Sequence, residues 1–570
     1  MLRFCKVLLL VLGVGYVWAN NTNGAVACES ALCTQIGIDT MKEGGNAADA
    51  MVATQICIGT VDMYDSGIGG GGFVLVRSKE GAYEFIDFRE TAPAAAYEKM
   101  FTEETIKLSL RGGLAAAVPG ELRGLKIMHE KYGQKPWKDL FKPSIKLARE
   151  GFKVTEALDS AMIASTDGRY AYLGYDYDFL TYDPEWAIDF APNGTRVGLG
   201  DVMTRKRFAD TLESIAEYGP DVFYTGAIAN ATIIALQRAN GTMTLSDLKN
   251  YTILNRPISN ITYRGFKVFS GSAPSSGAVL CSILKIVEGY DMRTPSALNL
   301  STHYLDEAMK FGYGQRTLLG DPTFLPNLTA YQLEMYSENT AEECRSKIED
   351  YGVLQTMDYE PPGQLFDVPD HGTTAVVSAD KSGLTIALTS TVNFYFGNTM
   401  MVPETGVILN NQMNDFSIFN TSNAFGVRDS PSNYIAPLKR PLSSIAPVIV
   451  EFPNGTVYIV HACAGGSRIT TEISQHLWHI LDQNLTSAEA LASPRMHDQL
   501  YPPQVEFEWA DPAHGLVGYN NQTTAFMKSI GANITFVGFS SAGQAIRRLS
   551  NGTFEAAAEP RQLASGGYAF

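Results

Sequence analysis

The sequence predicts a mixed α/β protein. Helical and strand periodicities alternate along the 570 residues, and no internal repeat or low-complexity linker interrupts them. Hydrophobic residues make up 45% of the chain and charged residues 18%, which is enough to bury a large core. Periodicity alone supports no finer statement than helices mixed with strands.

The expected elements follow one another along the whole chain. Apolar residues at helical spacing predict helices over 35–58, 120–133, 137–150, 227–239, 276–290 and 302–318. Apolar runs predict strands over 73–78, 83–88, 375–391, 446–451 and 456–462. The stretch 340–372 is rich in charge, Pro and Gly, so we expect it to be exposed and mobile.

The N-terminus has the composition of a secretory signal peptide. Arg3 and Lys6 precede or flank an apolar run that ends in Val17-Trp18-Ala19, with small residues where a signal peptidase cuts. The run is shorter than the ~20 residues that cross a membrane. We therefore expect residues 1–19 to be a signal peptide and the product to be secreted and extracellular. A membrane-anchored protein with its catalytic part outside the cytosol is the alternative. Fourteen Asn-x-Ser/Thr sequons fit the secretory pathway.

Charge and motifs exclude several classes of function. The formal net charge is −16 and no long Lys/Arg run occurs, so a nucleic-acid partner is not expected. The glycines of 67–72 match a dinucleotide pattern, but they precede the apolar strand 73–76 instead of following a strand. We interpret them as a site of close backbone packing. The sequence predicts no organic cofactor and no metal.

A candidate nucleophile, Thr373, lies directly after Gly372 in the run Asp-His-Gly-Thr-Thr at 370–374. If the chain is cut between Gly372 and Thr373, Thr373 gains both a hydroxyl nucleophile and a free α-amine that can act as its base. The cut would give a large piece, 20–372, and a small piece, 373–570. Gly-Thr pairs also open many ordinary strands, so the surrounding residues decide between these interpretations.

Those surroundings identify a family. The chain resembles the γ-glutamyltransferases (γ-glutamyl transpeptidases), which are N-terminal-nucleophile hydrolases, from about Gly24 to Tyr568. Ten ordered blocks carry the resemblance: GGNAADA at 44–50, SGIGGGGF at 66–73, DFRETAP at 87–93, AAAVPGELRG at 115–124, DHGTT at 370–374, TSTVNFYFG at 389–397, GVILNNQMNDFS at 406–417, KRPLSSIAP at 439–447, AGGSRITT at 464–471 and PRMHDQL at 494–500.

The resemblance implies a fold and an activity. The fold would be a four-layer αββα sandwich, built jointly by the large and small subunits of one precursor. The enzyme would cleave itself, take the γ-glutamyl group of glutathione and its conjugates onto Thr373, and pass it to water, amino acids or dipeptides. It would need no cofactor, and Cys33 and Cys57 would form a disulfide.

The resemblance also assigns roles in the site. Thr391 would orient the N-terminus of the small subunit, and the amides of Gly465 and Gly466 would bind the oxyanion. An arginine fork suits the donor's α-carboxylate, whereas an anion with neutral acceptors suits its α-ammonium. The proposed carboxylate ligands are Arg89, Ser443 and Ser444, the proposed ammonium ligands are Asp415, Asn393 and Gln412, and Tyr395 would line the pocket mouth. We expect folding to bring these residues into one pocket around Thr373.

Two features depart from the family or leave alternatives open. Ala375 and Val377 stand where relatives commonly carry His and Ser, which leaves the rate of self-cleavage open. Thr374 is a second candidate nucleophile, but the family spacing to Gly383 and Thr391 fits only Thr373. The alternatives are a related amidase of the cephalosporin-acylase type and a catalytically inactive glycoprotein of the same fold.

Overall fold

Two facing β-sheets form the centre of the molecule. The computed structural model describes residues 21–168, 177–359, 372–419, 430–512, 515–538 and 541–570. The first sheet has the order β18-β1-β9-β10-β2-β3-β6, with bounds β1 Gly24–Cys28, β2 Gly71–Arg77, β3 Tyr83–Asp87, β6 Leu254–Arg256, β9 Gly372–Asp380, β10 Thr385–Asn393 and β18 Gly566–Ala569. The second has the order β17-β16-β12-β11-β8-β7, with bounds β7 Ile258–Tyr263, β8 Phe266–Gly271, β11 Val448–Glu451, β12 Val457–Ala464, β16 Ala542–Arg548 and β17 Phe554–Ala557. Strands β9 and β10 pack across the interface against β12 and β16.

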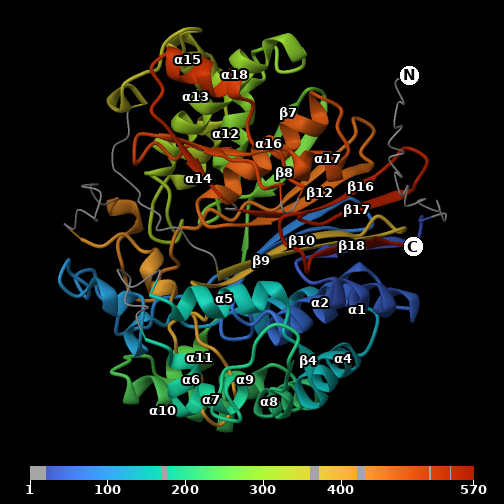
Figure 1. The fold of residues 1–570 in the computed structure, drawn as a ribbon, viewed down its shortest axis with the longest axis vertical. Helices are drawn as coiled ribbons and strands as arrows, with labels where there is room; N and C mark the ends of the chain where they lie inside the picture. Colours follow the sequence, from blue (N-terminus) through green and yellow to red (C-terminus); the bar gives the residue numbers. More distant parts are fainter. Residues whose placement is uncertain (1–20, 169–176, 360–371, 420–429, 513–514, 539–540) are drawn as a thin grey trace, which may run out of the picture.

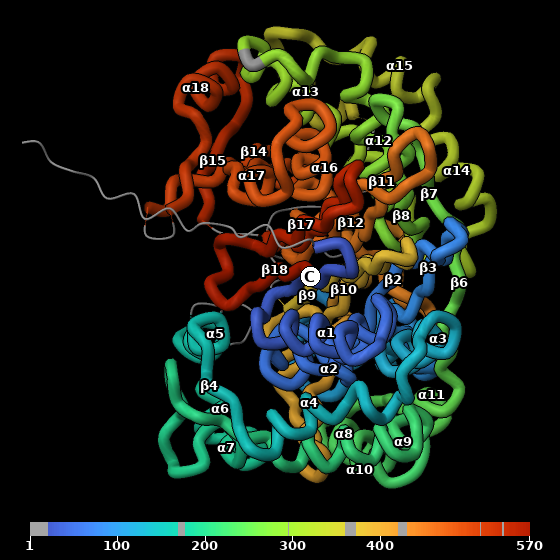
Figure 2. Tube along the Cα trace, turned by 90° about the vertical axis from the view of Figure 1, so that its right-hand side faces the viewer, coloured from blue at the N-terminus to red at the C-terminus, as the bar shows by residue number. Residues whose placement is uncertain are grey.

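Helices cover the outer face of each sheet (Figure 1). Helices α1 (Ala31–Lys42) and α2 (Ala47–Val61) lie on the first sheet, and α12 (Gly277–Val287), α13 (Leu298–Arg316) and α16 (Arg468–Leu481) lie on the side of the second sheet. Beyond α2, a further group of helices includes α4 (Trp137–Glu150), α8 (Lys206–Tyr218) and α10 (Gly226–Arg238). The turned view in Figure 2 shows the same succession of helices, two sheets and helices. The predicted mixed α/β fold is confirmed.

The alternation of side chains along β9 and β10 separates two hydrophobic cores. Val376 and Leu388 belong to the core between the first sheet and its helices. Ala375, Val377 and Ala387 belong to the core between the two sheets. Because side chains alternate across a strand, Thr373 shares the inter-sheet face with Ala375 and Val377. The two residues that depart from the family pattern therefore fill the core next to the nucleophile.

Most expected elements form, and the boundaries differ for identifiable reasons. The helix expected over 35–58 is divided into α1 and α2 at Gly44, whose φ of +94° ends the first helix. Asn46 then caps α2 by accepting from the amides of Ala48 and Asp49. The strand expected over 375–391 is a hairpin, β9 and β10, which turns at Gly383 with φ of +94°.

The structure tests only part of what the sequence predicts for the segment 340–372 and for the N-terminus. Part of 340–372 folds as helix α15 (Glu338–Lys347), which is more order than the composition predicts. Residues 360–371 and the expected signal peptide, 1–19, lie outside the described residues. In the part of the chain that is described, no helix is both long and apolar enough to cross a membrane.

The expected disulfide is present. Cys33 of α1 and Cys57 of α2 are bonded, with their Cα atoms 5.4 Å apart. Cys28, Cys281, Cys344 and Cys463 are buried and are not disulfide-bonded. The bridge ties α1, which packs on β1 and β18, to α2, which packs on β9 and β10.

Candidate active site

The candidate nucleophile, Thr373, and Thr391, expected to orient it, are direct partners across the β9–β10 hairpin. Thr373 pairs with Thr391 in the register. The Thr373 hydroxyl donates to Thr391 Oγ1 at 3.0 Å, and Thr391 donates in turn to the carbonyl oxygen of Gly372 at 2.6 Å. The backbone N–H of Asn393 donates to Thr391 Oγ1 at 2.7 Å. Thr391 therefore connects the attacking hydroxyl to the carbonyl of the bond that would be cut.

Gly372 occupies a position with no room for a side chain. It is buried, and a Cβ built on it would lie 2.4 Å from the backbone carbonyl of Phe394. The pairing shifts register here, because Asn393 adopts φ of +80° and pairs with Gly372. This bulge places the Gly372 carbonyl beside the Thr391 hydroxyl.

Two glycines of the run 67–72, Gly70 and Gly72, pack against β10 of the β9–β10 hairpin. A Cβ on Gly70 would lie 2.1 Å from the Thr391 oxygen, and one on Gly72 would lie 2.1 Å from the Thr389 oxygen. Gly71 and Gly72 pair with Thr391 and Ser390 at the start of β2. Close backbone approach explains these glycines, as the sequence predicts.

Arg89 and Asp415, expected at opposite ends of the donor, contact each other. Arg89 follows β3 and is only 1% exposed. Its guanidinium donates to Asp415, and it lies 3.8 Å from the carboxylate of Glu90. Gln412 Nε2 donates to Asp415 Oδ2 at 2.6 Å. The two charges of the expected clamp therefore neutralise each other in this state.

Hydrogen bonds connect this clamp to the nucleophile. Asn393 donates through Nδ2 to the Asn411 oxygen at 3.1 Å, and Asn411 Oδ1 accepts from the Phe394 N–H at 3.1 Å. Gln412 follows Asn411 directly. Within the described ranges, Asn393 Oδ1 and Gln412 Oε1 are buried acceptors that receive no hydrogen bond. Such oxygens suit an ammonium ligand. The sequence did not single out Asn411, although it lies in the block that contains Gln412 and Asp415.

Ser443 and Ser444 lie in the segment that precedes β11 of the second sheet. The Ser443 N–H donates to the Pro274 oxygen at 2.8 Å, and Thr470 of α16 donates to the Ser444 oxygen at 2.9 Å. Both serines are buried. Their backbone is therefore fixed by the loop before α12 and by the first turn of α16.

Gly465 and Gly466 form the turn between β12 and α16. Their φ values are +131° and +57°. The Thr389 hydroxyl of β10 lies 3.5 Å from the Cys463 oxygen of β12, so the two strands meet at this point. Thr391 and Gly465 each lie two residues beyond that contact. The turn therefore begins two residues past a contact between β12 and the strand that carries Thr391.

Tyr395 lies half-buried just after the hairpin. Its ring packs edge-on against Tyr64, with ring centroids 5.5 Å apart. The ring also packs against the core between the first sheet and its helices.

Buried carboxyl groups that the sequence analysis did not identify surround the catalytic strands. Burial raises the pKa of Glu121 to about 7, and Glu121 accepts from Ser390 of β10 and from Gln55 at 3.2 Å. Burial raises the pKa of Glu90 to about 8, although Arg89 opposes the shift. Glu29 accepts from the Ala375 N–H at 3.2 Å. Glu90 and Glu121 lie in sequence blocks singled out above, but burial, which decides their protonation, is not readable from composition.

This arrangement can carry out acyl transfer. It presents a hydroxyl nucleophile next to a buried hydroxyl partner, a charged clamp for a zwitterion and a glycine turn with bare amides. A metal ion or organic cofactor is not required for any of these functions.

Comparison with known proteins gives a consistent result. The family model described as gamma-glutamyltranspeptidase matches residues 33–568. The chain is 47% identical over 556 residues to the glutathione hydrolase proenzyme of Arthroderma benhamiae, covering 95% of this chain and 92% of that protein. It is 44% identical over 547 residues to the glutathione hydrolase of Aspergillus flavus, covering 95% and 89%. The chain belongs to the γ-glutamyltranspeptidase family.

A solved structure supports the fold separately. Cephalosporin acylase from Bacillus halodurans superimposes with a TM-score of 0.80 at 24% identity, covering 96% of both chains. At this identity the likeness concerns the fold alone. The family is therefore established by the sequence relatives, and the chain is an enzyme of that family.

Proposed function

We propose that this family member is a secreted, self-processing γ-glutamyltransferase and glutathione hydrolase in which Thr373 is both the maturation residue and the catalytic nucleophile. The observation that carries the residue assignment is the hydroxyl chain from Thr373 through Thr391 to the Gly372 oxygen. It joins a nucleophile to the carbonyl of its own peptide bond.

Maturation begins at that bond. The Thr373 oxygen attacks the Gly372 carbonyl carbon, and its proton passes to the nitrogen of Thr373 as the C–N bond breaks. Gly372 is then held as an ester on Thr373. Water hydrolyses the ester, which leaves a carboxylate on Gly372 and restores the Thr373 hydroxyl with a free α-amine. Thr391, which donates to the Gly372 oxygen, stabilises the negative charge that forms there.

The donor then replaces the ion pair between Arg89 and Asp415. A γ-glutamyl compound carries an α-carboxylate and an α-ammonium, so it can satisfy both residues when they separate. Arg89 binds the carboxylate with help from Ser443 and Ser444. Asp415 binds the ammonium with the free oxygens of Asn393 and Gln412. A donor that lacks either charge leaves a buried partner unpaired, which is costly.

Transfer proceeds through an acyl-enzyme. The free amine of Thr373 takes the hydroxyl proton as the oxygen attacks the γ-carbonyl, and the amides of Gly465 and Gly466 bind the oxyanion. The amine then protonates the leaving group, which is cysteinylglycine when glutathione is the donor. Water, an amino acid or a dipeptide attacks the ester and regenerates Thr373.

The two pieces remain one unit in this proposal. The large subunit, 20–372, and the small subunit, 373–570, together build the four layers of the sandwich. Residues 1–19 direct the chain into the secretory pathway, and membrane attachment applies only if that segment is kept.

The test compares wild-type protein with Thr373→Ala on a denaturing gel and in a γ-glutamyl anilide assay. Wild type should give two fragments and release the anilide. Thr373→Ala should stay a single chain without transferase activity, and Thr373→Ser should cleave slowly. Two fragments from Thr373→Ala, cut at the same bond, would show that an outside protease performs the cut.

A further inference from the structure

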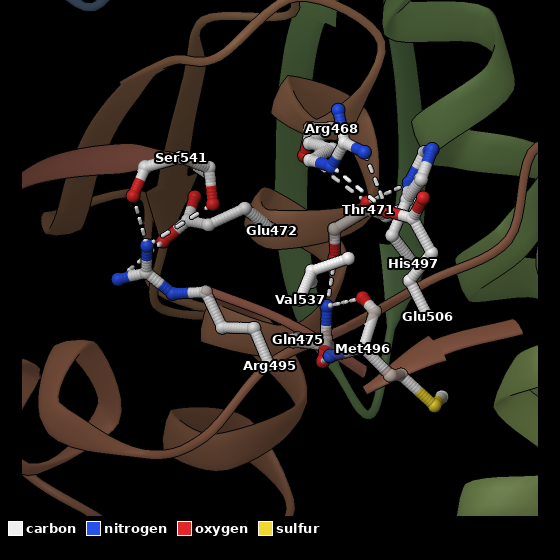
Figure 3. Close-up of a pocket in the computed structure, with 10 residues that line it drawn as sticks. All are labelled: Arg468, Thr471, Glu472, Gln475, Arg495, Met496, His497, Glu506, Val537 and Ser541. Atoms are coloured by element: carbon white, nitrogen blue, oxygen red, sulfur yellow. Dashed lines mark hydrogen bonds and ion pairs between the residues drawn. The ribbon is translucent and has the colours of Figure 1, made fainter. Parts of the chain in front are cut away.

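One face of α16 is bound to the segment that follows α17 (Ser487–Ala492). Arg468, Thr471, Glu472 and Gln475 share this face, because residues three and four apart are neighbours on a helix. Thr471 Oγ1 lies 2.9 Å from His497 Nδ1, and Gln475 exchanges two hydrogen bonds of 2.8 Å with the backbone of Met496. Figure 3 shows these side chains directed at one another across a small polar cleft.

The cleft itself is too small for a substrate. The space that its ten lining residues enclose measures about 10 Å³, about the room of one water molecule. The contacts of this face therefore hold two parts of the fold together and do not form a second binding site.

Glu472 is the centre of a buried charge network at this face. Its Oε2 lies 2.8 Å from His461 Nε2 of β12, and its Oε1 lies 3.8 Å from Arg495. Arg495 also pairs with Glu559 at 2.7 Å and donates to the backbone oxygen of Ser541, which precedes β16. Burial raises the pKa of Glu472, but His461 and Arg495 outweigh burial and hold the pKa far below its ordinary value. Glu472 is therefore an anion that links β12, α16 and β16.

The same residues also suggest a metal site, which the ring geometry opposes. Ligand atoms of His461, Glu472 and His476 lie within 4.8 Å of one another. The two imidazoles are stacked, with centroids 4.0 Å apart and planes 9° from parallel. Imidazole lone pairs lie in the ring plane, so one ion cannot sit about 2.0–2.1 Å from a nitrogen of each of two stacked rings. Arg495 adds a positive charge beside Glu472.

The network lies directly behind the glycine turn. His461 and Gly465 are four residues apart on β12 and its continuation, and Glu472 is in the second turn of α16. The first amides of α16 donate back to the turn, from Arg468 to the Gly465 oxygen at 3.1 Å and from Ile469 to the Gly466 oxygen at 3.2 Å. The orientation of the two glycine peptides is thus set by the position of α16 relative to β12.

We propose that Glu472 and Arg495 are positioning residues for the oxyanion turn: by locking α16 to β12 and β16, they fix the direction of the Gly465 and Gly466 amides. This inference rests on the proposed oxyanion role of those two glycines. It also gives a function to the PRMHDQL block, whose Arg495, Met496 and His497 all contact α16. Neither Glu472 nor Arg495 is among the proposed donor ligands.

The test uses cleaved, two-fragment enzyme and a γ-glutamyl anilide as donor. Glu472→Gln removes the charge and keeps the shape, and Arg495→Lys keeps the charge and removes the fork. Each should lower kcat at least tenfold while KM for the donor stays within threefold, because the amides act on the transition state. A purely structural role would not separate kcat from KM in this way.

Asp482→Asn is the matched control. Asp482 is a buried carboxylate at the other end of α16, where Arg264 donates to it at 2.8 Å and Tyr263 at 2.6 Å. At a comparable loss of Tm, Asp482→Asn should keep kcat within threefold of wild type. Equal losses of kcat in all three variants, or wild-type kcat in Glu472→Gln, would overturn the inference.

Two further experiments test the inference if the first variants fail to mature, or if the cluster binds a metal. If neither network variant yields cleaved enzyme, Thr471→Val, which removes the hydroxyl contact to His497, should lower kcat without changing KM; an unchanged kcat would overturn the inference. Zinc added to wild type should leave Tm unchanged, and a rise in Tm that His476→Ala abolishes would establish a metal site instead. Inactive wild-type enzyme would contradict the proposed function itself.

Discussion

At the scale of single residues, the Thr391 hydroxyl takes part in three hydrogen bonds that bear on the proposed reaction. It accepts from Thr373 and from the Asn393 amide, and it donates to the Gly372 oxygen. The sequence marked Thr391 through the family resemblance and through its spacing from Thr373. The structure adds that this one hydroxyl contacts both the Thr373 hydroxyl and the Gly372 carbonyl oxygen.

Arg89→Lys tests the donor clamp. Lysine keeps the charge but cannot make two parallel hydrogen bonds to a carboxylate. We therefore expect kcat/KM for γ-glutamyl donors to fall, by an amount equivalent to a loss of about 2–4 kcal/mol of transition-state stabilisation. Arg205→Lys is the control, because Arg205 is equally buried but binds the backbone oxygens of Gly59, Thr60 and Gly406. Steady-state kinetics would contradict the clamp if kcat/KM fell equally in both variants, or if kcat/KM of Arg89→Lys stayed at the wild-type value.

Glu121→Gln tests the effect of a buried acid on stability. The pKa of Glu121 rises from 4.5 to about 7 on folding, so the folded chain keeps a proton that the unfolded chain releases. Stability from this group is therefore highest below about pH 4.5, falls as pH rises to about 7, and stays low above that. Glutamine removes the penalty, so Glu121→Gln should gain up to about 3 kcal/mol relative to wild type at pH 8 and little at pH 4.5.

Asp321→Asn should change the stability of the fold with pH in the opposite direction. Burial raises the pKa of Asp321, but Arg256 and backbone donors lower it below its ordinary value overall. The ionised form is thus stabilised by folding, and Asp321→Asn should lose stability at neutral pH and lose less as pH falls. Melting temperatures of both variants at several pH values decide the matter. A Glu121→Gln effect that does not change with pH would contradict the buried-acid explanation.

At the scale of elements, the glycines before and within β2 allow this strand to pack closely against the β9–β10 hairpin. Alanine at Gly70 would place Cβ 2.1 Å from the Thr391 oxygen, so β2 or β10 must move. The sequence predicted close packing here from the order of glycines and strand. It could not predict that the packed partner is the strand that carries Thr391.

Gly70→Ala should therefore affect maturation as well as stability. Overpacking of this kind costs about 1–3 kcal/mol, and displacement of Thr391 should slow self-cleavage. Gly198→Ala is the control, because its nearest neighbour would be an Asp159 oxygen at 3.9 Å. The uncut fraction on a denaturing gel over time, together with Tm, measures both effects. Normal cleavage in Gly70→Ala at a lowered Tm would show that the hairpin tolerates the shift.

At the scale of the whole molecule, the two expected pieces share both sheets. Residues before the cut supply β1, β2, β3 and β6 to the first sheet, and residues after it supply β10, β18 and nearly all of β9. The second sheet is divided in the same way. Buried ion pairs also cross between the pieces, from Arg77 to Glu451 at 2.6 Å and from Arg440 to Asp87 at 2.5 Å.

Cleavage should therefore leave the molecule in one piece. The two fragments should elute together in native buffer, separate only under denaturing conditions and melt in a single transition, because neither piece can keep its sheets alone. Thr373→Ala, as an uncut chain, gives the reference elution volume. Separation of wild-type fragments in native buffer would contradict the shared-sheet assembly.

The sequence by itself determined the mixed α/β class, most long helices and the family, and it nominated the candidate residues of the site. These depend on local periodicity or on ordered blocks of residue types, which a single chain displays directly. Gly44 and Gly383 show the limit of that approach: each divides an apolar run that looked continuous, because a positive φ reverses the chain without interrupting the apolar pattern.

Only the tertiary structure shows which side chains that are distant in the sequence contact one another. Arg89 contacts Asp415 although more than 300 positions separate them, and His461 contacts Glu472 across a strand and a helix. Composition does not record burial, so it could not show that Glu121 titrates near neutrality or that Glu472 remains an anion. Those properties arise from the low-dielectric layers between sheets and helices, which exist only after distant segments have packed together.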